Sequence, residues 1–271
     1  MNPLFAVLLG LVQGVSEWLP ISSKTQVLFA STFLFSLPLA VAYAFGLFME
    51  IGSIGSAIAY FRKDIWSLLR DRKLLIYLFV VTACTGIVGV PLYYLTDKIL
   101  ASNPYNIGIP MILLGLVLIG TGFYIRYSRT KPKLLAGLGE MKLKNYVIIG
   151  IAQGIAALPG VSRSGMTVST MLLMGVKPNQ AFRLSYLAYI PASLGAFFVT
   201  LILSRSQVDT AIQVVEPTGV LIAALVGIFV ISYLLKFAKI SRIYVVDFVL
   251  GSVALIIGII ATLLAPQTSS T

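Results

Sequence analysis

Two polar stretches interrupt an otherwise apolar sequence, and both contain residue types that bind anions. The first, QGVSEWLPISSKTQ, covers residues 13–26, and the second, QGIAALPGVSRSGMT, covers residues 153–167. The planar guanidinium of Arg163 suits phosphate oxygens, and an arginine at membrane depth normally marks a function. Helices that restart near Ser22 and near Ser162 would also direct free backbone N–H groups and helix dipoles toward an anion. We therefore expect the two stretches to form one anion-binding pocket.

Two carboxylates, Glu17 and Glu50, lie well inside apolar segments. An ionisable residue at membrane depth is a candidate for function. The two side chains could together hold a divalent cation, position a water molecule, or neutralise Arg163 and Lys24. Plainer roles stay open as well, because Arg163 could pair with either glutamate for structural reasons and the serines could simply cap helices.

The composition indicates that these stretches belong to a membrane protein. Of 271 residues, 58% are apolar and 11% are charged, whereas a soluble domain carries roughly 25% charged residues. We expect residues 1–271 to form a single polytopic membrane domain with no signal peptide. The net charge of +11 is explained by basic loops that face anionic lipid, and no nucleic-acid partner is expected. Histidine is absent, which removes the usual acid–base residue and the commonest metal ligand.

The apolar segments predict an all-α integral membrane fold. A spanning helix needs about 20 mostly apolar residues. Six segments qualify, and they cover residues 41–61, 74–95, 107–127, 184–204, 218–238 and 245–264. Two pairs of shorter segments, 4–19 with 26–37 and 146–158 with 165–175, are interrupted by the polar stretches. Such pairs are typical of re-entrant helical hairpins, which gives six transmembrane helices plus two hairpins.

The basic residues and an internal similarity predict that the two halves are inverted. Sixteen of the twenty Lys and Arg residues fall on one predicted face, which should be cytoplasmic. Both termini then lie outside the cell, and the first hairpin opens outward, so the site would be reached from the outer side. GLVQGVSEWLPISS aligns with GIAQGIAALPGVS at an offset of 140 residues. The repeat halves are approximately 1–127 and 145–264, and such repeats place a binding site near the membrane midplane.

The two polar stretches resemble the signature of the undecaprenyl-diphosphate phosphatase family. QGVSEWLPISS resembles its first motif, and PGVSRSGMT matches the second, Pro-Gly-x-Ser-Arg-Ser-Gly-x-Thr, without a gap. The resemblance spans nearly the whole chain. It implies a plasma-membrane enzyme that uses Mg²⁺ or Ca²⁺ to hydrolyse an undecaprenyl- or dolichyl-type polyprenyl diphosphate to polyprenyl phosphate, and so recycles a lipid carrier. Membrane lipids and this substrate are the expected partners, and a homodimer is left open.

The resemblance also assigns roles to individual residues. The catalytic residues would be Glu17, Ser23 and Arg163. It also places Ser22, Ser162, Ser164 and Thr167 beside the substrate phosphates, and Gln13 beside Glu17. From the residues themselves, we expect Lys24 and Gln26 to contact the phosphates as well, and Glu17, Glu50 and Gln13 to be the metal ligands.

The sequence departs from the family pattern in the first stretch. Gln26 stands where the family usually has His, and Lys24-Thr25 replaces a small pair. Two chemical routes remain: Ser23 attacks the terminal phosphorus, activated by Glu17 or the metal, or a metal-bound water attacks with Glu17 as base. The alternative function is a flippase or transporter of the lipid carrier that kept the anion site and lost catalysis.

Overall fold

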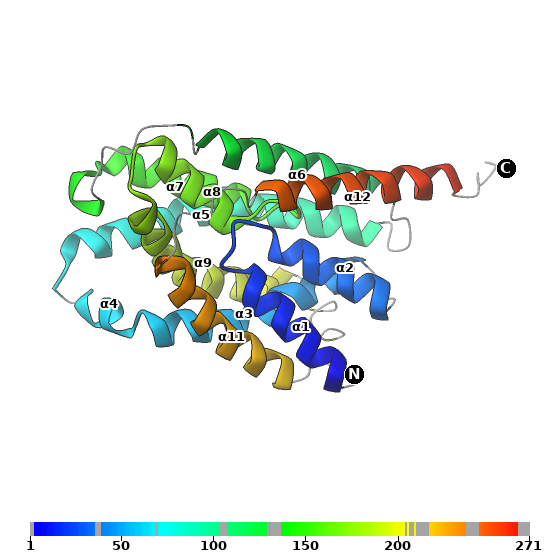
Figure 1. Ribbon diagram of the computed structural model, residues 1–271, viewed down its shortest axis with the longest axis horizontal. Coiled ribbons are helices and arrows are strands. Elements are labelled where there is room, and N and C mark those ends of the chain that lie inside the picture. Colours follow the sequence, from blue (N-terminus) through cyan, green and yellow to red (C-terminus); the bar gives the residue numbers. More distant parts are fainter. Residues whose placement is uncertain are drawn as a thin grey trace.

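The computed structural model describes residues 3–35, 39–68, 70–102, 108–128, 130, 137–203, 205, 209, 217–236 and 244–264. The regular structure within these ranges is helical throughout (Figure 1). The helices are α1 (Pro3–Ser16), α2 (Ser23–Phe35), α3 (Leu39–Tyr60), α4 (Arg62–Ser67), α5 (Arg72–Ser102), α6 (Gly108–Ser128), η1 (Leu138–Glu140), α7 (Leu143–Ile155), α8 (Arg163–Leu173), α9 (Pro178–Leu203), α11 (Pro217–Lys236) and α12 (Tyr244–Leu264). An all-α fold is confirmed.

The long helices are those of a multi-pass membrane protein. Among the described residues, four segments are long and apolar enough to cross a membrane, namely Arg72–Thr96, Met111–Ser128, Pro178–Leu203 and Pro217–Lys236. Large apolar side chains cover their outer surfaces; Phe79, Ile202 and Phe229 are each more than 70% exposed. Lipid is the environment in which such a surface is stable, because it matches the apolar side chains as water cannot.

Both polar stretches break a helix. The first break separates α1 from α2 and contains Pro20, and the second separates α7 from α8 and contains Pro159. Gly160 has a φ of +90°, a backbone conformation that glycine adopts without a steric penalty. The two members of each helix pair pack against each other. Helix pairs with a polar break are therefore present at both places where the sequence predicts them.

Small residues let each helix pair approach the other half of the chain. A methyl group on Gly10 or Gly14 of α1 would lie less than 3 Å from atoms of α11. A methyl group on Gly150 or Gly154 of α7 would lie equally close to atoms of α5. The packing of α1 on α11 thus corresponds to the packing of α7 on α5, while α6 and α12 run side by side (Figure 1).

The main core cluster fixes the first break against α9. Trp18, at the break, is fully buried. Its ring makes edge-on contacts with Tyr186 and Tyr189, at centroid distances of 5.0 and 4.9 Å. The hydroxyl of Tyr186 donates a hydrogen bond to the backbone oxygen of Trp18 at 2.5 Å. These contacts hold the segment that carries Glu17 in one position.

Candidate active site

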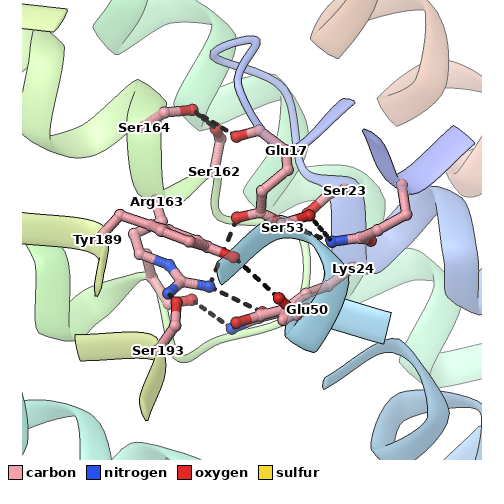
Figure 2. Close-up of polar contacts among 12 residues, drawn as sticks. Glu17, Ser23, Lys24, Glu50, Ser53, Ser162, Arg163, Ser164, Tyr189 and Ser193 are labelled. Atoms are coloured by element: carbon pink, nitrogen blue, oxygen red, sulfur yellow. Dashed lines mark hydrogen bonds and ion pairs between the residues drawn. The ribbon is translucent and has the colours of Figure 1, made fainter. Parts of the chain in front are cut away.

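The two helix breaks meet in the interior and enclose a small polar cavity (Figure 2). Ser164 ties them together, because its hydroxyl donates to the backbone oxygen of Leu19 at 2.7 Å. The cavity has a volume of about 10 Å³, roughly the space that one water molecule needs. Its lining residues are Glu17, Ile21, Ser22, Ser23, Lys24, Ala156, Val161, Ser162 and Arg163. Both polar stretches therefore contribute to one pocket, as the sequence predicts.

Ser23 and Glu17 form a hydrogen-bonded pair at this cavity. Ser23 Oγ donates to Glu17 Oε2 at 2.7 Å, and Gln13 Nε2 donates to the same oxygen at 2.8 Å. Gln13 Nε2 lies 3.2 Å from Ser53 Oγ as well. A serine hydroxyl in contact with a fixed carboxylate is the arrangement of a nucleophile and its general base.

Arg163 is held by four groups around its guanidinium. Nη2 donates to Glu50 Oε1 at 2.7 Å and lies 3.6 Å from Glu17 Oε1. Nη1 donates to Ser193 Oγ. The ring of Tyr189 lies against the guanidinium, with 4.6 Å from Cζ to the ring centre, a cation–π contact. A guanidinium fixed in this way at a cavity presents a rigid positive charge to an anion.

Lys24 brings a second positive charge to the same place. Its Nζ lies 3.8 Å from Glu50 Oε1 and donates to the backbone oxygen of Ala156 at 3.5 Å. Lys24 and Glu50 expose only 10% and 2% of their side chains. The ammonium therefore sits between the two helix breaks rather than extending to the surface.

Helix N-termini point into the cavity from both breaks. Ser162 caps α8, since its Oγ accepts a hydrogen bond from the Gly165 backbone N–H at 3.0 Å. At the start of α2, Thr25 Oγ1 donates to Ser22 Oγ at 2.8 Å, and the Gln26 N–H donates to the Ser22 backbone oxygen. The positive ends of both helix dipoles add to the field that favours an anion.

The residues expected to bind a divalent cation fit that role poorly. Glu17 Oε2 accepts two hydrogen bonds, and Glu17 Oε1 and Glu50 Oε1 each face Arg163. Within the described residues, no cluster of three or more His, Cys, Asp or Glu side chains could hold a metal, so most of the oxygen ligands of Mg²⁺ or Ca²⁺ would have to come from water or substrate phosphate. Gln13 Oε1, which is buried without a hydrogen-bond partner, is the atom of this set best suited to a cation.

A larger cavity opens next to the small one, between α5, α7 and α9. Its volume is about 160 Å³, and its walls are mostly apolar. Gly86 and Gly195 form part of the wall. Lys24, Ala156 and Arg163 line both cavities. The two cationic side chains thus stand at the junction between a polar space and an apolar one.

Comparison with known proteins identifies the family. Residues 6–260 match the family model described as "Bacitracin resistance protein BacA". The chain belongs to the BacA family. A relative from Sulfurisphaera tokodaii, named undecaprenyl-diphosphatase, is 56% identical over 97% of this chain and 100% of its own length. Relatives with the same name from Saccharolobus solfataricus and Pyrobaculum islandicum are 48% and 39% identical over 95% and 98% of this chain.

Three of the residues expected to bind phosphate line neither cavity. The Ser164 hydroxyl links the two breaks through its hydrogen bond to the Leu19 backbone oxygen. Thr167 Oγ1 donates to the Arg163 backbone oxygen and contacts Ser185. Gln26 lines neither cavity, and its Nε2 is buried without a hydrogen-bond partner. The phosphate-binding roles of these three residues stay predictions.

The structure adds three residues to this BacA-family site that the sequence did not single out as functional: Ser53, Tyr189 and Ser193. Helical spacing carries a signal for one of them, because Ser53 follows Glu50 by three residues in α3. Ser193 follows Tyr189 by four residues in α9, but Tyr189 was itself not singled out, so this spacing gave no signal. Residues at these spacings share a helix face, so a polar residue one turn from a functional one is a candidate for the same site.

Proposed function

We propose that this protein is a membrane phosphatase that hydrolyses polyprenyl diphosphate to polyprenyl phosphate and inorganic phosphate, and so recycles a lipid carrier. The observation that carries the proposal is the pair of Ser23 and Glu17, 2.7 Å apart, beside Arg163 in a buried polar cavity. Relatives up to 56% identical are named undecaprenyl-diphosphatase. These names favour hydrolysis over the transporter alternative.

The chemistry follows from the arrangement of the side chains. Ser23 Oγ attacks the terminal phosphorus while its proton passes to Glu17, and the bond to the bridging oxygen breaks to release polyprenyl phosphate. Glu17 then releases this proton to solvent and, ionised again, takes a proton from the water that attacks the phosphoserine. The bond between phosphorus and Ser23 Oγ breaks, Oγ regains its proton from Glu17, and phosphate is released. Phosphoryl transfer depends mostly on positioning and neutralisation of charge, and Arg163 and the N-termini of α2 and α8 supply both.

The two cavities suit the two parts of a diphosphate lipid. The terminal phosphate belongs next to Ser23 and Arg163, where the small cavity has to open further to admit it. The lipid-linked phosphate belongs at the junction, beside Lys24, and the isoprenoid chain begins in the larger apolar cavity. An apolar cavity with a few polar groups at one end is the usual form of a site for a small amphipathic ligand.

We propose that the chain crosses the plasma membrane six times and forms two re-entrant hairpins, with its two halves inverted relative to each other and both termini outside. The matched packing of α1 on α11 and of α7 on α5 supports the inversion.

We propose that the substrate reaches the site from the outer side of the membrane. After Cys84→Ser removes the single native cysteine, a membrane-impermeant thiol reagent should modify Ser23→Cys in intact cells. Modification only in inverted vesicles would refute outer access.

The function is tested by phosphate release from a long-chain polyprenyl diphosphate by purified protein in detergent. Wild type should release phosphate, and Arg163→Ala should lower the rate by about 100-fold or more, because it removes the fixed charge beside the reacting group. Asp247→Asn is the control, since Asp247 is a buried carboxylate outside both cavities. Binding of the lipid without any release by wild type would favour the transporter instead.

A further inference from the structure

The charges around the small cavity are balanced before any substrate binds. Glu17 and Glu50 supply two negative charges, and Lys24 and Arg163 supply two positive charges. Each of these four side chains is at most 10% exposed, so water screens their interactions weakly. Without Lys24 the site would hold one excess negative charge, which would oppose a diphosphate.

This balance leaves little reason for a divalent cation to bind. A metal ion between Glu17 and Glu50 would lie close to Arg163 and Lys24, because both cations are within 4 Å of Glu50 Oε1. Like charges so close in a buried site repel strongly. The metal would therefore have to displace ion pairs that the protein already makes, or enter against two fixed positive charges.

We propose that Lys24 takes the place of the divalent cation, so that the enzyme binds and cleaves the diphosphate without added metal. The proposal rests on the phosphatase function above. Lys24, like Arg163, lines both cavities, and it follows Ser23 directly in the chain. Its ammonium therefore faces the lipid-linked phosphate when the terminal phosphate is next to Ser23.

The role of Lys24 is to stabilise the leaving group. When the bond between the terminal phosphorus and the bridging oxygen breaks, the electron pair stays on that oxygen, and the departing polyprenyl phosphate gains negative charge. Lys24 Nζ neutralises this charge at the junction, while Arg163 neutralises the terminal phosphate. A positive charge that is already fixed where negative charge develops lowers the barrier without further rearrangement.

The test compares wild type with Lys24→Met, a neutral side chain of similar length, in excess EDTA and in a titration of Mg²⁺ or Ca²⁺. Wild type should release phosphate at the same rate, within about twofold, in EDTA and in metal. Lys24→Met in EDTA should be slower by about 10- to 100-fold, the usual effect of a lost charged hydrogen bond. Added metal should restore part of that loss. Lys177→Met, at an exposed position, should behave like wild type.

Binding of a polyprenyl diphosphate analogue with a methylene bridge gives a second measurement that does not depend on turnover. In EDTA the wild type should bind it, and Lys24→Met should bind about tenfold more weakly or worse. Loss of wild-type activity and binding in EDTA, with recovery on adding metal, overturns the role of Lys24 while leaving the phosphatase intact. Equal binding by wild type and Lys24→Met in EDTA also overturns it. Absence of phosphate release under every metal condition refutes the phosphatase function itself.

Discussion

Replacing Ser23 by alanine decides which of the two chemical routes the enzyme uses. If Ser23 is the nucleophile, Ser23→Ala removes the covalent step, and the rate should fall by at least about 10³-fold, as for other enzymes that lose a nucleophile. If water attacks, the variant loses only the 2.7 Å hydrogen bond to Glu17. A hydrogen bond to a charged group contributes about 1.5–3 kcal/mol, so the rate would then fall by only about 10- to 100-fold. The geometry favours the larger effect.

The double variant sharpens this prediction. Because Glu17 acts on Ser23, the variant Ser23→Ala/Glu17→Gln should be no slower than Ser23→Ala alone, since residues that act as a unit are not additive. The assay is phosphate release at saturating substrate, together with rapid quenching of a substrate labelled in its terminal phosphate to trap phosphoserine. Ser252→Ala is the control, because Ser252 is an exposed serine of α12 that lines neither cavity. A loss of 100-fold or less in Ser23→Ala, with no labelled protein in wild type, would refute the serine route.

Further predictions test the cavities and the packing. Gly195→Phe should slow turnover of a long-chain substrate about tenfold or more and leave turnover of a short-chain substrate unchanged, because a side chain there enters the larger cavity. The control is Gly120→Phe, at a position that also has open space but lies outside both cavities. This variant should not discriminate between the long-chain and the short-chain substrate. Gly150→Leu should lower the free energy of unfolding by about 1–3 kcal/mol, measured by thermal melting in detergent, because its side chain would clash with α5. Arg163→Lys should lower kcat/KM about 10- to 100-fold, because lysine keeps the charge but cannot contact Glu50 and Ser193 together. Gln26→His should leave the phosphate-release rate unchanged, because position 26 lines neither cavity; a large increase would contradict this placement.

Helical spacing and polarity were sufficient to predict part of the site. Gln13 and Glu17 are four residues apart, and their side chains meet at 2.8 Å, as expected for one helix face. The serine at the start of α8 caps the helix through the Gly165 N–H, which its residue type also predicts. These features depend on the local backbone, so the sequence alone carries them.

The pairing of distant charges could not be predicted in the same way. Arg163 could have paired with Glu17 or Glu50, and both alternatives were open in the sequence. In the folded chain Arg163 donates to Glu50 at 2.7 Å and lies farther from Glu17, at 3.6 Å. Arg163 and Glu50 are 113 positions apart in the chain, and the distance between their side chains follows from the packing of α3 and α8 against α9. No local rule fixes it.

The sequence by itself determined that the chain enters a membrane, and it determined where the helices break. It also determined that the breaks carry serines and two cationic side chains, which together favour an anion. Tertiary structure decided which side chains face the cavities. Lys24 and Ser23 point into them, whereas Thr167 faces α9 and Gln26 lines neither. The physical reason is that residue type and spacing fix the relative directions of side chains along one helix. The rotation of that helix about its own axis is fixed only when it packs against its neighbours.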